Sequence, residues 1–171
     1  MKKINLIFFF LILTNFSYAE DKVVYLDVNF LLSESEVGKY VNSNLKKISD
    51  DNNKLFKNFE IELKSDEEKI LAQQNILKKE DYEKKISELK NKFKSYQDKK
   101  NIKNKELNLL RNNAGNIILK NINEIMTEYS KNNSISLVIQ KQSIIIGKTE
   151  LDVTNDILEL LNKKITKLEL K

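Results

Sequence analysis

The stretch from Val37 to Lys131 contains no proline, and its apolar residues recur every three or four positions. Proline interrupts helices, and this spacing aligns apolar side chains along one helical face, so the stretch predicts helix. We expect the chain to reverse at residues 75–81, although no glycine or proline marks a turn there. A helix of roughly fifty residues is about 75 Å long. Such an arm cannot bury itself in a compact core, so it must pack as a hairpin, against partner chains, or against something that it holds.

Both flanks of this arm carry β-branched apolar runs. Residues 22–28, 136–140 and 143–147 predict three short strands, the last two joined by a tight turn at Lys141-Gln142. A short amphipathic helix follows, capped by Asp152 or Thr154, and Ser33 or Ser35 can cap the first long helix. We therefore expect an α+β fold. Residues 20–36 and 133–171 form a small β-body of three strands and a C-terminal helix, and residues 37–132 project from it as a helical hairpin.

The first 19 residues predict a cleavable export signal. Lys2 and Lys3 precede an apolar run too short to span a bilayer, and Ser17-Tyr18-Ala19 predicts cleavage before Glu20. We expect an exported protein that is soluble after cleavage. The chain has no cysteine, so it folds without disulfides and carries no lipid on an N-terminal cysteine.

The composition argues against catalysis. Histidine and cysteine are absent, which removes the usual transition-metal ligands, the commonest general base and a thiol nucleophile. No glycine-rich phosphate loop is present, and carboxylate pairs such as Glu67-Glu68 fit a solvated helical face. We expect no enzyme activity, no metal and no cofactor.

Positive charge is concentrated in the second helix. Residues 84–105 hold nine lysines against Glu88 and Asp98, a net charge of +7. This face is either an attractor for acidic polypeptides, anionic lipid or lipopolysaccharide, or the ordinary solvation of a long helix in a lysine-rich chain. Nucleic acid is a poor partner for an exported protein. Phe56 lies beside the apolar seam, so we expect it to be exposed. The candidate binding residues are Lys84, Lys85, Lys90, Lys92, Lys94, Lys99, Lys100 and Phe56.

The apolar seam weakens in the middle of the arm. Between Tyr96 and Leu107 the only strongly apolar residue is Ile102, and Lys100 and Lys103 occupy seam positions. Charged groups are costly to bury unpaired, so this level, opposite residues 54–61, is predicted to be loosely packed and bendable. Alternatively, the lysine stems extend past a normal seam.

The ordered motifs at the two ends resemble the Skp/OmpH family of periplasmic chaperones. Val23–Asn29 with Ser35-Glu-Val-Gly-Lys39 is similar to that family's opening strand and helix start. Leu137-Val-Ile139, Ile144-Ile-Ile-Gly147 and Leu151–Leu158 are similar to its closing segments. The similarity covers residues 22–164.

The resemblance implies a jellyfish-like homotrimer whose strands build one body and whose three arms enclose a cavity. It also implies ATP-independent holding of unfolded outer-membrane β-barrel proteins. The alternative from the residues is a structural coiled-coil adaptor in the envelope that binds one folded partner, which predicts a tight, unbroken seam.

Overall fold

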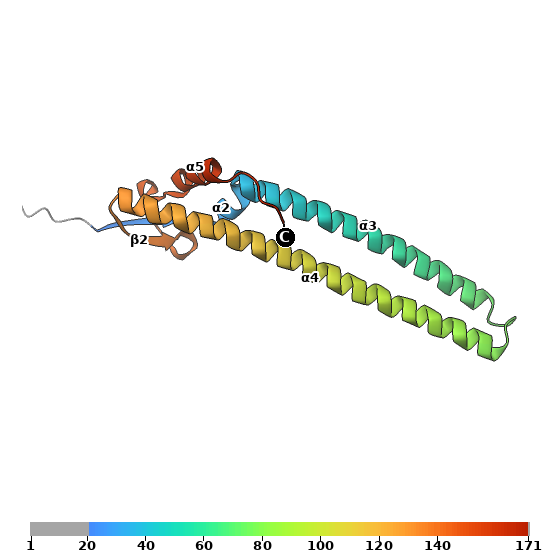
Figure 1. Cartoon of the computed structure of the whole chain (residues 1–171). Helices are drawn as coiled ribbons and strands as arrows, with labels where there is room; N and C mark the ends of the chain where they lie inside the picture. Colours follow the sequence, from blue (N-terminus) through green and yellow to red (C-terminus); the bar gives the residue numbers. More distant parts are fainter. Residues whose placement is uncertain (1–20, 171) are drawn as a thin grey trace, which may run out of the picture.

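The computed structural model describes residues 21–170, so the predicted signal peptide lies outside the described residues. Two long helices dominate the chain, and the remaining elements gather at one end of them (Figure 1). In chain order the elements are β1 (Lys22–Leu26), α2 (Val28–Glu34), α3 (Glu36–Ala72), α4 (Lys79–Asn132), β2 (Ile135–Gln140), the 3₁₀ turns η1 (Lys141–Ser143) and η2 (Thr149–Leu151), and α5 (Thr154–Lys164).

The predicted helical hairpin is confirmed. Helix α3 has 37 residues and α4 has 54, and the two run antiparallel away from the body. The turn between them occupies residues 73–78, so it begins two residues before the predicted position. It closes without glycine or proline because Gln73 accepts hydrogen bonds from the backbone of Ile76 and Leu77, at 3.1 and 3.0 Å.

Within residues 21–170 the body contains two strands rather than the predicted three. Strands β1 and β2 pair in parallel, with Val23 opposite Leu137. The predicted antiparallel hairpin after residue 140 is wrong, because the Ile144 backbone N–H bonds to the Lys141 carbonyl and the chain enters a 3₁₀ turn. The following apolar run pairs with no strand in the described part of the chain, and Ile145 and Ile146 are 99% and 91% exposed.

Helix α2 was not expected from the sequence, where its first residue was assigned to a strand. It starts because the Asp27 carboxylate accepts a hydrogen bond from the Phe30 backbone N–H at 3.0 Å. The predicted cap of the long helix is confirmed for Ser35, whose buried hydroxyl accepts from the Gly38 N–H at 3.1 Å. The C-terminal helix α5 is confirmed, but its predicted cap is not: the N-cap residue is Val153, which makes no capping hydrogen bond, and the Asp152 carboxylate accepts from the N–H of Thr154, the first helical residue, at 3.0 Å.

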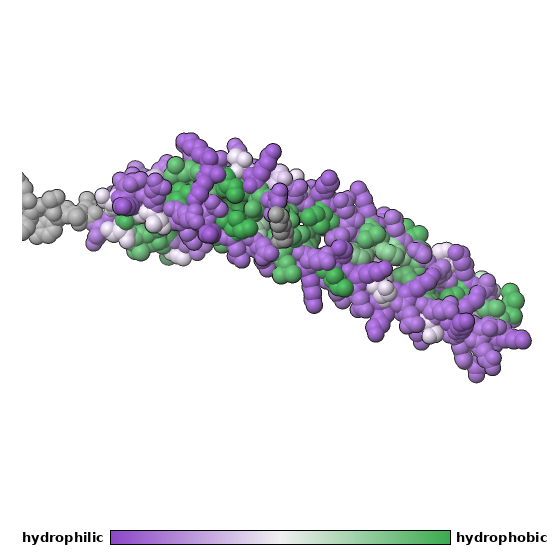
Figure 2. Space-filling view, viewed as in Figure 1, coloured by the Kyte–Doolittle hydropathy of each residue, from purple (hydrophilic) through white to green (hydrophobic). Residues whose placement is uncertain are grey.

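The apolar core lies at the body end of the hairpin, where α2 and α5 pack on the first turns of α3 and the last turns of α4. The core lies there because a continuous apolar stripe is found only at the start of α3 and at the end of α4. The largest fully buried side chains there are Val24, Leu31, Val37, Ile118, Ile122, Ile157 and Leu161. Outside the body, the arm presents mostly hydrophilic side chains with scattered apolar patches (Figure 2).

Candidate functional site

The arm buries very little of its own surface. Among the described residues between Leu45 and Ala114, only Phe56 and Tyr96 are buried, at 4% and 8% exposure. Their rings meet edge to face, with centroids 5.9 Å apart and planes at 80°. This contact between the two buried rings joins α3 to α4 in the middle of the arm.

The expectation that Phe56 is exposed is therefore wrong. A strict 3.6-residue period counted from Leu45 reaches residues 52, 56 and 59, so Phe56 lies on the seam. The neighbouring Leu55 lies off this period and is 44% exposed. The correct phase was available in the sequence, but Asn52 interrupts the apolar pattern and hides it.

A polar group completes this contact. The Tyr96 hydroxyl donates to the Glu60 carboxylate and accepts from the Lys100 ammonium at 2.8 Å. The Lys100 Nζ lies 3.3 Å from Glu60 Oε1, and 5.9 and 5.3 Å from the centroids of the Phe56 and Tyr96 rings. We call Phe56, Glu60, Tyr96 and Lys100 the mid-arm cluster. The level predicted to be loosely packed thus contains one packed cluster, with hollows beside it.

These hydrogen bonds shift both charged groups in the cluster. The hydrogen bonds from Tyr96 and then Lys100 lower the pKa of Glu60, and the bonds with Tyr96 and then Glu60 raise the pKa of Lys100. Both groups therefore remain charged over a wider pH range than they would alone.

The seven candidate lysines do not form one uniform face. Four of them reach toward α3. Lys85 donates to Gln73 at 2.8 Å, and Lys92 pairs with Asp66 at 2.6 Å. The Lys99 ammonium lies 5.3 Å from the centroid of the Phe59 ring, and Lys100 belongs to the mid-arm cluster. The other three are exposed and make no hydrogen bond or ion pair among residues 21–170: Lys84, Lys90 and Lys94.

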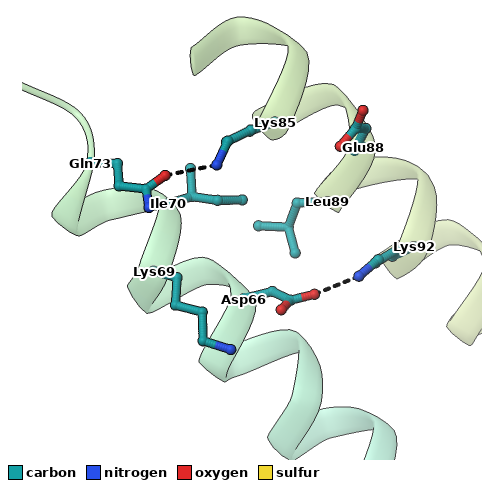
Figure 3. Close-up of a pocket in the computed structure, with 8 residues that line it drawn as sticks. All are labelled: Asp66, Lys69, Ile70, Gln73, Lys85, Glu88, Leu89 and Lys92. Carbon is teal, nitrogen blue, oxygen red and sulfur yellow. Dashed lines mark hydrogen bonds and ion pairs between the residues drawn. The ribbon is translucent and has the colours of Figure 1, made fainter. Parts of the chain in front are cut away.

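Two of these contacts frame a small hollow near the turn. Figure 3 shows Lys85 and Lys92 extending from α4 toward α3, with Ile70 and Leu89 between them. The hollow has a volume of about 250 Å³. The Lys92 hydrogen bond lowers the pKa of Asp66, and the same bond raises the pKa of Lys92. One ion pair and one hydrogen bond therefore join the two helices across this hollow.

A larger hollow lies beside the mid-arm cluster. Its volume is about 620 Å³, and its apolar lining consists of Leu63, Leu89, Phe93 and Tyr96. Its charged lining consists of Glu60, Lys64, Glu67 and Lys90. We call this hollow the Phe93 groove.

Phe93 is the residue that the sequence interpretation missed. It is 50% exposed, and its ring centroid lies 6.1 Å from that of Tyr96. Leu89, Phe93 and Tyr96 follow one another at helical spacing, so the sequence predicts packing for all three and does not separate the exposed ring from the buried one.

Two classes of site are absent from the part of the chain that the structure describes. Within residues 21–170, no three acidic, cysteine or histidine side chains gather where they could hold a metal ion. None of the helices in that range has an apolar stretch long enough to cross a bilayer.

Comparison with known proteins places these features in context. The profile of the OmpH-like outer membrane protein family matches residues 22–161, which include both the body and the arm. A crystal structure from Caulobacter crescentus, solved as a candidate OmpH-like outer membrane chaperone, superposes with a TM-score of 0.80. The two chains are 18% identical over 87% of this chain and 88% of that one, a likeness that shows the shared fold. No curated protein matches this chain.

Proposed function

Because this chain belongs to the OmpH-like outer membrane protein family, whose members include chaperones, we propose that it is an ATP-independent holdase of the periplasm. It binds unfolded outer-membrane β-barrel proteins and prevents their aggregation. The resemblance to this family seen in the end motifs is confirmed by the family match over residues 22–161.

One observation carries the proposal. Over the whole arm between Leu45 and Ala114, the helices bury two side chains and leave hollows between them. A spacer that only separates two folded partners is best served by a continuous seam, as in a coiled coil. An interrupted seam instead leaves apolar and charged groups available to a mobile chain. This favours the holdase over the structural adaptor.

We further propose that the chain works as a homotrimer. The body is thin for a stable unit, and small cores commonly gain stability by association. Strand β2 has β1 on one side and no strand on its other side among residues 21–170. The exposed pair Ile145 and Ile146 follows this open edge. A neighbouring copy would pair with the edge and cover the isoleucines.

The lysines contribute to client retention in this proposal. Lys84, Lys90 and Lys94 are available to acidic segments of a client, whereas the other four candidates already contact α3. The availability of these three lysines supports an electrostatic component, which salt weakens because exposed charges are screened beyond about 10 Å at 0.1 M.

The test is to dilute a urea-denatured outer-membrane barrel protein into the mature protein without nucleotide and to follow light scattering. We expect suppressed aggregation, weakened at high salt and weakened by replacing Lys84, Lys90 and Lys94 with glutamine. If neither high salt nor the lysine substitutions change the suppression of aggregation, the electrostatic component of the proposal is refuted. Aggregation as fast as in buffer would refute the holdase and favour the adaptor.

A further inference from the structure

The charged side chains that line the Phe93 groove differ in whether they already have a partner. Of its charged side chains, Glu60 is occupied by Tyr96 and Lys100. Lys64 and Lys90 make no hydrogen bond or ion pair within residues 21–170. Two ammonium groups therefore face one available carboxylate, that of Glu67, across an apolar floor.

The groove is larger than the hollow near the turn and differs from it in character. The hollow in Figure 3 is crossed by the Lys85–Gln73 and Lys92–Asp66 contacts. In the Phe93 groove, the hydrogen bond from Tyr96 to Glu60 joins the helices only where the groove meets the mid-arm cluster, and Phe93 offers half of its surface to solvent. Its volume lies within the range of sites that bind drug-sized groups, which are mostly apolar with a few polar contacts.

The groove also continues along the arm. A second hollow of about 460 Å³ shares Glu60, Phe93 and Tyr96 with it and extends to Asn101. Two hollows that follow one another along the arm and share lining residues suit an elongated occupant. Extended polypeptide fits this shape, because its side chains alternate between the floor and the rim.

We propose that the Phe93 groove binds an extended segment of unfolded polypeptide in which a large apolar or aromatic side chain neighbours an acidic one. The apolar side chain lies on the Phe93 ring, and the carboxylate lies between Lys64 and Lys90. This inference rests on the proposed function and gives it a sequence preference.

The first test uses three fluorescent peptides that differ at two positions: aromatic with aspartate, aromatic with lysine, and serine with aspartate. Binding to the mature protein is followed by fluorescence anisotropy. We expect the aromatic–aspartate peptide to bind tightest. We expect Phe93→Ser to weaken binding of this peptide about tenfold, because the peptide's aromatic side chain then has no apolar ring on which to be buried. Leu109→Ser is the matched control, since Leu109 is an exposed apolar residue of α4 outside the groove. Equal losses in the two variants would overturn the proposal.

The second test separates the lysines. The double variant Lys64→Gln/Lys90→Gln should abolish the preference for aspartate over lysine while retaining the preference for an aromatic side chain. The control Lys54→Gln/Lys57→Gln removes the same charge at two exposed lysines of α3 outside the groove and should retain both preferences. If both doubles lose the aspartate preference equally, general electrostatics explains it and the proposal fails.

The two levels of proposal fail in different ways. If the protein suppresses aggregation of a barrel protein but binds the three peptides equally, the groove preference is overturned and the holdase stands. If it neither suppresses aggregation nor binds any peptide, both are overturned. Circular dichroism and size-exclusion chromatography of every variant establish that the exposed substitutions leave the fold intact.

Discussion

Replacing Phe56 with alanine should release the middle of the arm while leaving the body folded. The ring is 4% exposed and makes the edge-to-face contact with Tyr96. Exposing a buried phenylalanine costs about 1.5–3 kcal/mol, and an aromatic pair adds about 0.5–1.5 kcal/mol. We therefore expect a local loss of about 2–4 kcal/mol. Because hollows flank the ring, the helices can partly collapse onto the space, which favours the lower part of that range.

Hydrogen–deuterium exchange measures this loss where it occurs. A loss of 2 kcal/mol or more accelerates exchange of locally protected amides by roughly thirtyfold or more. The acceleration should be confined to the mid-arm levels of α3 and α4, whereas amides around Ile118 and Ile122, in the body core, should keep their protection.

Leu55→Ala is the matched control. It removes a large side chain from the adjacent position, but this leucine is 44% exposed. We expect a much smaller change. If the two variants accelerate exchange equally, or if Phe56→Ala changes nothing, then the mid-arm cluster does not hold the helices together and our reasoning is refuted.

Three further predictions concern stability. Gly38→Ala should destabilise the protein by about 1–3 kcal/mol, because a Cβ there would lie 2.3 Å from a backbone carbonyl oxygen of α2. A Cβ at Gly115 meets nothing within 4 Å, so Gly115→Ala should stabilise the protein by about 0.5–1 kcal/mol. Urea unfolding of the two variants measures both changes. The hydrogen bond with a carboxylate of α5 raises the pKa of Tyr129 to about 12. Its contribution to the free energy of unfolding is therefore fully present below the unfolded-state pKa of 10.0 and is lost as the pH rises toward 12. Tyr129→Phe should lack that alkaline loss in unfolding measured against pH. The hydrogen bond from Lys92 lowers the pKa of Asp66, so the contribution of this pair to the stability of the arm is present above the unfolded-state pKa of 3.8. It is lost as the pH falls through the lower pKa of the folded state. Asp66→Asn should remove this acid dependence, which hydrogen exchange of the arm measures.

The long helices and their first cap could be predicted because the signals are local. Helical spacing and the Ser35 hydroxyl act within a few residues, so the sequence alone contains them. The strand arrangement could not be predicted in the same way. Whether Ile144–Gly147 becomes a strand depends on an edge that another segment must provide, and a β-branched run does not state its partner.

The candidate site was harder to predict for a related reason. Lysines at 92 and 94 look alike in the sequence, yet one pairs with Asp66 and the other faces solvent. That difference depends on the rotation of α4 against α3, which an irregular seam defines poorly. Phe56, expected to be exposed, is buried, and Phe93, expected to pack, is half exposed, because the irregular seam does not define the rotation of either helix.

The parallel pairing of β1 and β2 has a consequence for how the chain folds. Val23 pairs with Leu137, which lies 114 residues later in the sequence. Joining such distant segments directly through a flexible loop would be slow. The hairpin offers a faster route, since contacts that begin at the turn and advance toward Leu45 and Ala114 bring the two strands together step by step. Formation of the arm would then shorten the distance over which β1 and β2 must find each other, and the body would form last.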